Sequence, residues 1–276
     1  MNSYFDTHCH LNFSRFKKNV DEVFRQAIDA GVVGIVIPGT DIKTSQKSIE
    51  LAQKYGKEGF NVWSAVGIHP HHVFEPNDFD QLIADLEMLL KQERVVAVGE
   101  IGLDRHEYEE TKYKDYHVDE SFIEAQKKLF RAQFLCAIEH KKSVIMHNRE
   151  AKDDLVPLMR ELWDSSLKGR AVLHCCEPDP ELLLLAKELG LFLGVDGDLT
   201  YWEEKQAFIK EVPLEMLDIE TDAPFLLPEP LKSQKLYPNT PSNVVLVAQK
   251  VAEIKGESLE RVAEVTSANA RSLFGL

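Results

Sequence analysis

Apolar runs of four to seven residues, rich in Val and Ile, alternate along the chain with longer segments in which apolar residues recur at helical spacing. The short runs predict strands and the longer segments predict helices. Eight strands are expected, at residues 4–9, 32–38, 62–67, 95–101, 143–147, 171–174, 191–195 and 217–221.

The helical segments lie between these strands and after the last one. They are expected at residues 19–30, 44–55, 79–92, 121–140, 153–166, 179–189, 202–211, 242–255 and 258–272. Several are followed by a glycine, which suits a left-handed residue just past a helix: Gly31, Gly56 and Gly190.

Strands that alternate with helices favour a (β/α)₈ TIM barrel, although an open doubly wound sheet has a similar pattern. The length of 276 residues suits one barrel domain over residues 1–276. Six residues of metal-ligating type each end a predicted strand: His8, His10, Glu100, His147, His174 and Asp222. A barrel gathers such side chains around one mouth, whereas an open sheet would spread them across its width. We therefore predict the barrel.

The first two candidate ligands, His8 and His10, are two residues apart, so on a strand both imidazoles would point the same way and could hold one ion. A His-x-His motif by itself often arises by chance. It becomes significant here because further candidate ligands follow later in the chain. Glu100 ends a Val-rich strand between glycines. Because an unpaired buried carboxylate is costly to desolvate, we predict that Glu100 bridges two metals. A capped or salt-bridged Glu100 is the alternative.

His147 and His174 each end an apolar strand, and Asp222 ends the last one. Either histidine alone would more often be a core histidine than a ligand. Two on successive strands, facing the same mouth as Glu100, favour coordination. Asp222 could ligate the first ion and accept a proton from the attacking water, since a carboxylate beside a metal stays ionised. Its alternative role is that of a turn-forming or helix-capping residue.

The formal net charge of −14 argues against a broad basic surface that would hold duplex nucleic acid. Two divalent cations would reverse the sign of the electrostatic field at the site itself.

No signal segment begins the chain, and no apolar stretch approaches the roughly 20 residues of a membrane span. The four cysteines lack zinc-ribbon spacing, so we expect buried reduced thiols. We expect a cytoplasmic protein with no membrane association and no obligate protein partner.

Together, these motifs resemble those of the TatD family of metal-dependent hydrolases, from Asp6 to about Leu273. The resemblance implies two divalent ions, Zn²⁺, Mg²⁺ or Mn²⁺, and mixed imidazole and carboxylate ligands suit Mg²⁺ less well than the others. It implies that one ion is held by His8, His10, Glu100 and Asp222. The second ion would be held by Glu100, His147 and His174.

The resemblance also implies a role near the substrate for His69, which ends the third predicted strand and could donate a hydrogen bond to a phosphate oxygen. Alternatively, His69 packs under a loop. Arg149 could hold a phosphate bidentately at the rim, or form a structural pair with Glu150 or Asp104. Asp104 could orient a ligand or the loop behind it.

Two irregular segments leave the predicted mouth. Arg105 to Glu120 is polar and is either a solvated surface loop, which we favour, or a lid. Residues 224–241 have the same two alternatives, and here a functional role at the mouth is favoured over a surface loop.

Three features depart from the family pattern: Cys176 in place of an aromatic residue, Gly-Val-Asp-Gly-Asp at 194–198, and an Asn-Thr-Pro at 239–241 without a preceding Arg-Gly. They concern substrate identity and base stacking more than hydrolysis.

The leading hypothesis is a metal-dependent phosphodiester hydrolase, a TatD-type deoxyribonuclease that acts through a two-metal-activated water. The resemblance implies exonucleolytic action on DNA, and a limited basic surface suits single-stranded ends. Catalytic roles are expected for Glu100, Asp222 and His69, and substrate binding for His69 and Arg149. One alternative is a two-metal ester or amide hydrolase such as an aminoacyl-tRNA deacylase. Another is a catalytically idle, metal-bound nucleic-acid-binding protein.

Overall fold

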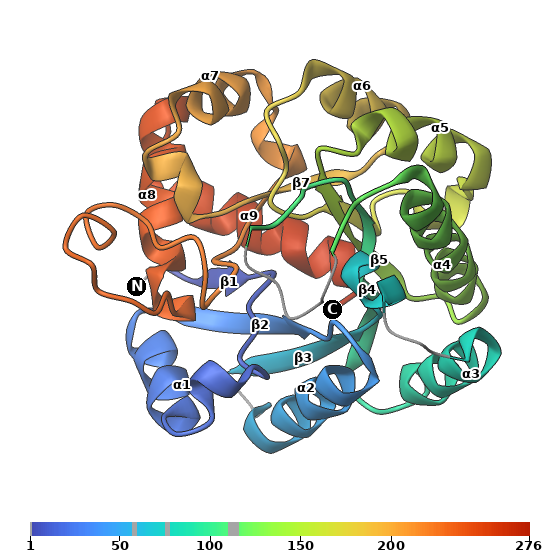
Figure 1. The fold of residues 1–276 in the computed structure, drawn as a ribbon. Coiled ribbons are helices and arrows are strands. Elements are labelled where there is room, and N and C mark those ends of the chain that lie inside the picture. Colours follow the sequence, from blue (N-terminus) through green and yellow to red (C-terminus); the bar gives the residue numbers. More distant parts are fainter. Residues whose placement is uncertain (1, 57–59, 75–77, 110–115) are drawn as a thin grey trace.

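Eight parallel strands pair in chain order in the computed structural model, which describes residues 2–56, 60–74, 78–109 and 116–276 (Figure 1). They are β1 (Tyr4–Asp6), β2 (Val32–Pro38), β3 (Asn61–Val66), β4 (Val95–Asp104), β5 (Ser143–Arg149), β6 (Ala171–Leu173), β7 (Phe192–Val195) and β8 (Leu217–Ile219). All eight predicted strands are present. β1 is shorter than predicted, and β4 and β5 extend further toward the mouth.

The sheet closes between β8 and β1 through residues just beyond the two strands. The Asp222 amide donates to the His8 carbonyl at 2.9 Å, and the His10 amide donates to the Ala223 carbonyl at 2.7 Å. Cys9 and Ala223 form an isolated parallel bridge. The predicted barrel is confirmed, and the hydrogen bonds that close it also bring the last candidate ligand beside the first two.

Helices surround the strands (Figure 1). They are α1 (Val20–Asp29), α2 (Ile42–Tyr55), α3 (Phe79–Leu90), α4 (Glu120–Glu139), α5 (Lys152–Leu162), α6 (Pro180–Leu189), α7 (Glu203–Glu211), α8 (Val244–Lys255) and α9 (Leu259–Phe274). All nine predicted helices are present, but α5 ends before its predicted boundary and a separate 3₁₀ turn, η3 (Ser165–Leu167), follows it. Among the described helices, none is long and apolar enough to cross a membrane.

Local sequence explains where several helices begin and end. The Asp41 carboxylate accepts from the Thr44 amide at 2.6 Å, and the Thr44 hydroxyl accepts from the Asp41 amide at 2.9 Å, which forms a capping box at α2. Gly190 ends α6 in the predicted left-handed conformation, with φ of 73°. The same prediction is wrong for Gly56, where φ is −68°. A Cβ there would clash with the guanidinium of Arg94, which donates to the Gly56 carbonyl at 3.1 Å.

The end of the barrel opposite the mouth is filled by apolar side chains and covered by α9, which crosses behind the strands in Figure 1. Asn269 Nδ2 donates to the Leu217 carbonyl at 2.8 Å, and the Ser143 hydroxyl donates to the Leu273 carbonyl at 2.5 Å. Both contacts lie where strands begin. The buried cluster comprises Phe5, Val36, Ala65, Ala97, Ile145, Val172, Phe192, Ala270, Leu273 and Phe274.

Candidate metal centre

The six candidate ligands meet at the carboxyl end of the barrel, two of them within β4 and β5 and the others just beyond the ends of β1, β6 and β8. Parallel strands end on the same side of a barrel, so residues far apart in sequence can converge there. The sequence predicted six candidate ligands at the ends of strands. The structure brings all six together: His8, His10, Glu100, His147, His174 and Asp222.

The first donor set contains His8, His10, Glu100 and Asp222. The Nε2 atoms of His8 and His10 are 3.1 Å apart. His8 Nε2 lies 3.6 Å from Glu100 Oε2 and 3.7 Å from Asp222 Oδ1, and His10 Nε2 lies 3.5 and 3.4 Å from the same two oxygens. Four ligands about 2.1 Å from a tetrahedral ion are about 3.4 Å from one another. The spacing of these donor atoms therefore fits one divalent cation.

The second donor set contains the other oxygen of Glu100 and two histidines. Glu100 Oε1 lies 3.0 Å from His147 Nδ1 and 2.9 Å from His174 Nε2, and the two ring nitrogens are 3.4 Å apart. With three protein atoms, this set would leave a coordination position for water or substrate, as catalytic sites do. Glu100 thus presents one carboxylate oxygen to each set.

Glu100 reaches the mouth because β4 is irregular around it. Side chains on one side of a regular strand are two residues apart, and Ala97 belongs to the apolar interior, so alternation would turn Gly99 and Ile101 inward. The pairing of β4 with β5 instead shifts register between Val98 and Ile101. Such irregularities re-aim side chains and are common beside active sites.

The electrostatics of the centre favour a cation. Burial raises the Glu100 pKa, but the charge of His174 and the hydrogen bonds from His147 and His174 outweigh it and hold that pKa well below its usual value. Burial lowers the His147 pKa, but hydrogen bonds with Asp104 and Glu100 outweigh it and raise the pKa to about 9. Carboxylates that stabilise an imidazolium in this way would also stabilise a divalent cation in contact with them.

Asp104, the last residue of β4, lies behind His147. Its Oδ2 atom is 3.0 Å from His147 Nε2 and 3.1 Å from His71 Nε2, and it accepts a hydrogen bond from the Tyr108 hydroxyl at 3.0 Å. Because Nε2 of His147 is engaged, Nδ1 is the nitrogen left to face Glu100. These contacts fit a role for Asp104 in orienting a ligand.

His69 lies at the rim of the second donor set, with Nε2 3.6 Å from Glu100 Oε1. The His71 amide lies 3.3 Å from His69 Nδ1, which accepts its hydrogen bond, so the neutral ring carries its proton on Nε2. Burial lowers the His69 pKa well below its usual value and keeps the ring neutral. His69 therefore offers an N–H donor to the site, as the predicted phosphate contact requires.

Arg149 is exposed at the end of β5. Its Nη1 atom donates to the Tyr108 hydroxyl at 3.0 Å, and its guanidinium carbon lies 4.9 Å from the centre of the Tyr108 ring. No ion pair joins Arg149 to Glu150 or Asp104, all of which the structure describes, so that alternative is wrong. Arg149 reaches Asp104 only indirectly, through Tyr108.

Two buried glutamines of α4, which the sequence analysis did not single out, hold the ends of β3 and β4. Gln126 accepts from the Asp104 amide at 2.8 Å and donates to the Asp104 carbonyl at 2.9 Å. Gln133 makes the same pair of bonds with Ile68, at 2.7 and 2.9 Å. Both are fully buried, two helical turns apart. Polar residues at that spacing on an apolar helix face are the signal that could have identified them.

The segment at 194–198 that departs from the family pattern contributes to a buried charge cluster. Lys205 Nζ of α7 lies 2.7 Å from Asp198 Oδ1 and 3.3 Å from Asp196 Oδ2, and Lys205 is fully buried. The single positive charge of Lys205 balances one of the two carboxylates, while burial and the neighbouring Asp196 raise the pKa of Asp198 to about 8. Asn239, from the retained Asn-Thr-Pro element, donates to the Thr221 carbonyl at 2.9 Å and supports the chain before Asp222.

The polar segment Arg105 to Glu120 is anchored at its start. Arg105 Nε lies 2.5 Å from Asp154, and Arg105 Nη1 lies 2.9 Å from Glu120. Tyr108 connects the segment to the centre through Asp104. Residues 110–115 lie outside the described residues, and the lid and surface-loop roles both stay predictions.

Comparison with known proteins identifies the family. The family model described as TatD related DNase matches residues 5–275. The chain belongs to this family. The 3′-5′ ssDNA/RNA exonuclease TatD of Escherichia coli K12 is 34% identical over 280 residues, which cover 99% of each chain. The uncharacterized metal-dependent hydrolase YabD of Bacillus subtilis strain 168 is 33% identical over 272 residues, 98% of each chain.

A solved structure of the same family agrees with the fold. The crystal structure of YJJV, a TatD homolog from Escherichia coli K12, superposes with a TM-score of 0.84 at 27% identity, covering 99% of this chain and 98% of that chain. The predicted TatD-family resemblance and the predicted TIM barrel are both confirmed.

Proposed function

We propose that this TatD-family chain is a divalent-metal-dependent phosphodiester hydrolase that acts on the ends of single-stranded nucleic acid, DNA first of all. The observation that carries the proposal is the Glu100 carboxylate, whose two oxygens face separate donor sets at 2.9–3.6 Å. Support for the substrate class comes from relatives named 3′-5′ ssDNA/RNA exonuclease, at about 34% identity over nearly the whole chain.

Two ions would occupy the two donor sets, with Glu100 as their shared ligand. His8, His10 and Asp222 would complete the first set, and His147 and His174 the second. The combination of imidazole and carboxylate donors suits Zn²⁺ or Mn²⁺ better than Mg²⁺. When bound, such cations polarise a phosphoryl oxygen and lower the pKa of water.

The side chains around the ions would have distinct roles. Asp222 keeps 15% of its side chain exposed at the mouth and would accept a proton from the attacking water. His69 would donate a hydrogen bond from its Nε2–H group to a phosphate oxygen. Arg149, exposed at the rim, would contribute positive charge to the same phosphate.

The test is hydrolysis of single-stranded DNA by purified protein with Mn²⁺ or Mg²⁺. Glu100→Ala and Asp222→Ala should abolish nucleotide release, because each removes a donor from the first set. Glu139→Ala is the matched control, since Glu139 is exposed at the far end of α4 and forms no ion pair with a described residue. Full activity of both alanine variants would reject the proposed roles. Faster cleavage of an aminoacyl ester than of DNA would instead favour an ester hydrolase.

We also propose a cytoplasmic location. All four cysteines are free thiols, which is typical of a reducing compartment. Three are buried as predicted, and Cys175 is half-buried.

A further inference from the structure

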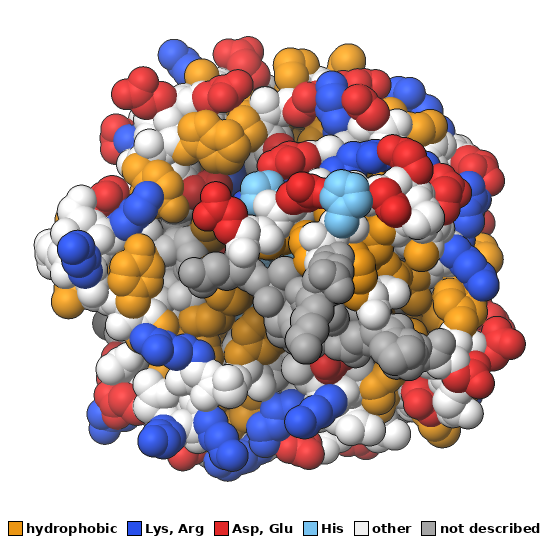
Figure 2. Space-filling view, viewed as in Figure 1, with side chains coloured by type: hydrophobic (Ala, Val, Ile, Leu, Met, Phe, Trp, Pro, Cys, Tyr) orange, Lys and Arg blue, Asp and Glu red, His pale blue; other side chains and the backbone are white. Residues whose placement is uncertain are grey.

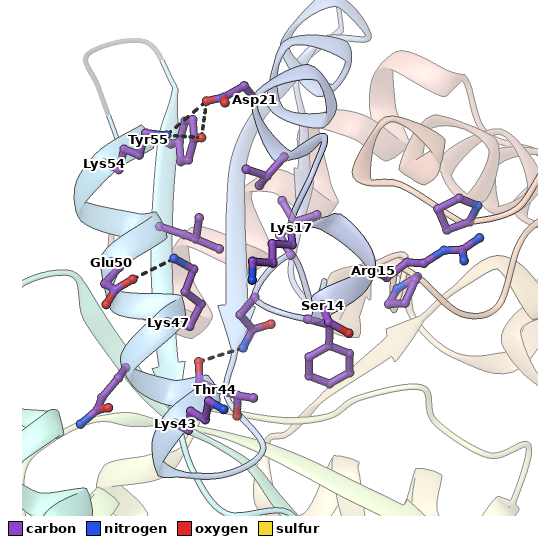
Figure 3. Close-up of a pocket in the computed structure, with 18 of the residues that line it drawn as sticks. Ser14, Arg15, Lys17, Asp21, Lys43, Thr44, Lys47, Glu50, Lys54 and Tyr55 are labelled. Carbon is purple, nitrogen blue, oxygen red and sulfur yellow. Dashed lines mark hydrogen bonds and ion pairs between the residues drawn. The ribbon is translucent and has the colours of Figure 1, made fainter. Parts of the chain in front are cut away.

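A groove runs beside the metal centre, between the segment that follows β1 and helix α2. Its volume is about 1210 Å³, and Pro224, Phe225, Tyr237 and Pro238 of the segment after β8 also border it. Figure 3 shows Lys17 and Lys43 on two sides of the groove, with Lys47 further along α2. None of the six candidate ligands lines the groove, so it is a separate feature of the molecule.

The acidic side chains of the groove are already engaged. Glu50 lies 2.8 Å from Lys47 Nζ, and Asp21 lies 3.3 Å from Lys54 Nζ (Figure 3). The remaining carboxylate that lines the groove, that of Asp41, caps the first turn of α2. Among the described residues that line the groove, three carboxylates face five basic side chains, so positive charge is in excess by two.

Three more cations of the groove have no such partner. Arg15, Lys17 and Lys43 are exposed, and none forms an ion pair with a residue that the structure describes. Figure 2 shows Lys and Arg side chains gathered over the α1 and α2 side of the molecule. On a chain of net charge −14, this local excess of positive charge suits an anionic ligand.

Aromatic rings line the groove, and two of them, those of Phe13 and Phe225, lie where the groove adjoins the metal centre. Phe13 stacks on the candidate ligand His10, with ring centres 4.4 Å apart, and Phe225 packs edge-on against Phe13 at 6.3 Å. Phe225 and Tyr237 are 51% and 54% exposed. Two half-exposed rings beside unpaired cations are the combination that proteins use for single-stranded nucleic acid, with stacking for bases and charge for phosphates.

The groove and the metal centre share a wall. His10 Nδ1 lies 3.3 Å from the Pro38 carbonyl, and Asn12 of the groove donates to that same carbonyl at 2.9 Å. On the other side, the Phe225 amide donates to the Asp222 carbonyl at 2.8 Å. A chain that leaves the centre past His10 and Asp222 would therefore enter the groove directly.

We propose that this groove binds the unpaired nucleotides next to the cleaved bond, so that one single strand occupies the metal centre and the groove together. The inference rests on the proposed phosphodiester hydrolase activity. Arg15, Lys17 and Lys43 contact phosphates, and Phe225 and Tyr237 stack on bases. A duplex would keep its bases from both rings, so the groove selects single strands.

The test compares Lys17→Gln/Lys43→Gln with the control Lys168→Gln/Lys187→Gln. The control lysines are exposed, have no ion pair with a described residue, and lie before β6 and β7, at the opposite end of the barrel. Binding of a fluorescent thymidine dodecamer is measured in EDTA across a salt series. The groove variant should bind about tenfold more weakly at low salt, and its dependence of log K on log salt should fall by about 0.7 per lost phosphate contact. The control should match wild type.

Cleavage separates failure of the groove from failure of the activity. With Mn²⁺, the ratio of kcat/KM for the dodecamer to that for a dinucleotide should fall about tenfold in the groove variant, because only the longer strand reaches the groove. Phe225→Ala should lower the same ratio. If wild type cleaves DNA and both ratios stay unchanged, the groove proposal is overturned while the activity stands. If no DNA is cleaved but dodecamer binding depends on Lys17 and Lys43, the activity fails and the binding groove remains.

Discussion

The two ends of the barrel are built from the same strands but have opposite character. Ile145 and Val172 pack in the apolar cluster under α9, and two residues further along the chain His147 and His174 face the donor atoms of the mouth. A step of two residues keeps a side chain on the same side of a strand. Each of these strands therefore supplies one residue to the core and one to the centre.

This separation means that stability and chemistry depend on different residues. At the closed end, burial of apolar area stabilises the fold. At the mouth, Glu100 and Asp104 are both buried, and buried carboxylates are stable only when cations or hydrogen-bond donors contact them. Substitutions at the two ends should consequently affect different measurements.

The largest expected effect is that of Glu100→Gln, which removes one negative charge and keeps the side-chain shape. Hydrolysis of single-stranded DNA should fall by at least about 10⁴-fold, a loss of about 5 kcal/mol of transition-state stabilisation. The thermal midpoint of the metal-free protein should move by only a few degrees, because no core contact changes. Retention of a tenth of wild-type activity would contradict the shared-ligand role.

Phe274→Ala tests the closed end. Phe274 is 3% exposed and its ring stacks on Phe5 at 6.4 Å, so truncation should reduce the free energy of unfolding by about 3–5 kcal/mol. Denaturant unfolding measures this, with Leu276→Ala as the control because Leu276 is 41% exposed. DNA hydrolysis per folded molecule should stay within about threefold of wild type. A large fall in activity without loss of stability would show that the two ends are coupled.

The sequence predicted the closed barrel and the chain positions of the candidate ligands because both depend on local periodicity. Val and Ile runs marked the strands, and His147 and His174 each follow such a run, so both were expected at the same mouth as the earlier pair. Parallel strands then made the convergence a consequence of the fold.

The rest depends on contacts between distant segments. Alternation alone would not have turned Glu100 inward, because the register shift in β4 arises from its pairing with β5. The bonds of Gln126 to Asp104 and the cover that α9 provides join segments whose relation no local pattern encodes. The conformation of Gly56 likewise follows from its contact with Arg94, and β3 and α3 separate these two residues in the sequence.

A smaller effect is expected from the ions themselves. At a concentration about 100 times its Kd, a divalent cation should stabilise the folded protein by about 2.7 kcal/mol per site. The thermal midpoint should therefore rise by about 5–10 °C for each site filled. Calorimetry with and without Zn²⁺ or Mn²⁺ measures the shift. The thermal midpoint of Phe274→Ala should start lower but rise by the same amount when metal binds. The midpoint of Glu100→Gln should rise much less. An equal rise in all three proteins would place the bound ions elsewhere.

The smallest effect is expected one layer behind the ligands. Asp104→Asn removes the charge that faces His147 Nε2 at 3.0 Å, so His147 should present Nδ1 less consistently to the second donor set. Metal affinity should fall about 10–100-fold, as measured by competition with a chromogenic chelator, and saturating metal should restore most of the activity. Asp29→Asn, at an exposed position near the end of α1, is the control. If kcat fell at saturating metal with affinity unchanged, Asp104 would act on the substrate rather than through His147.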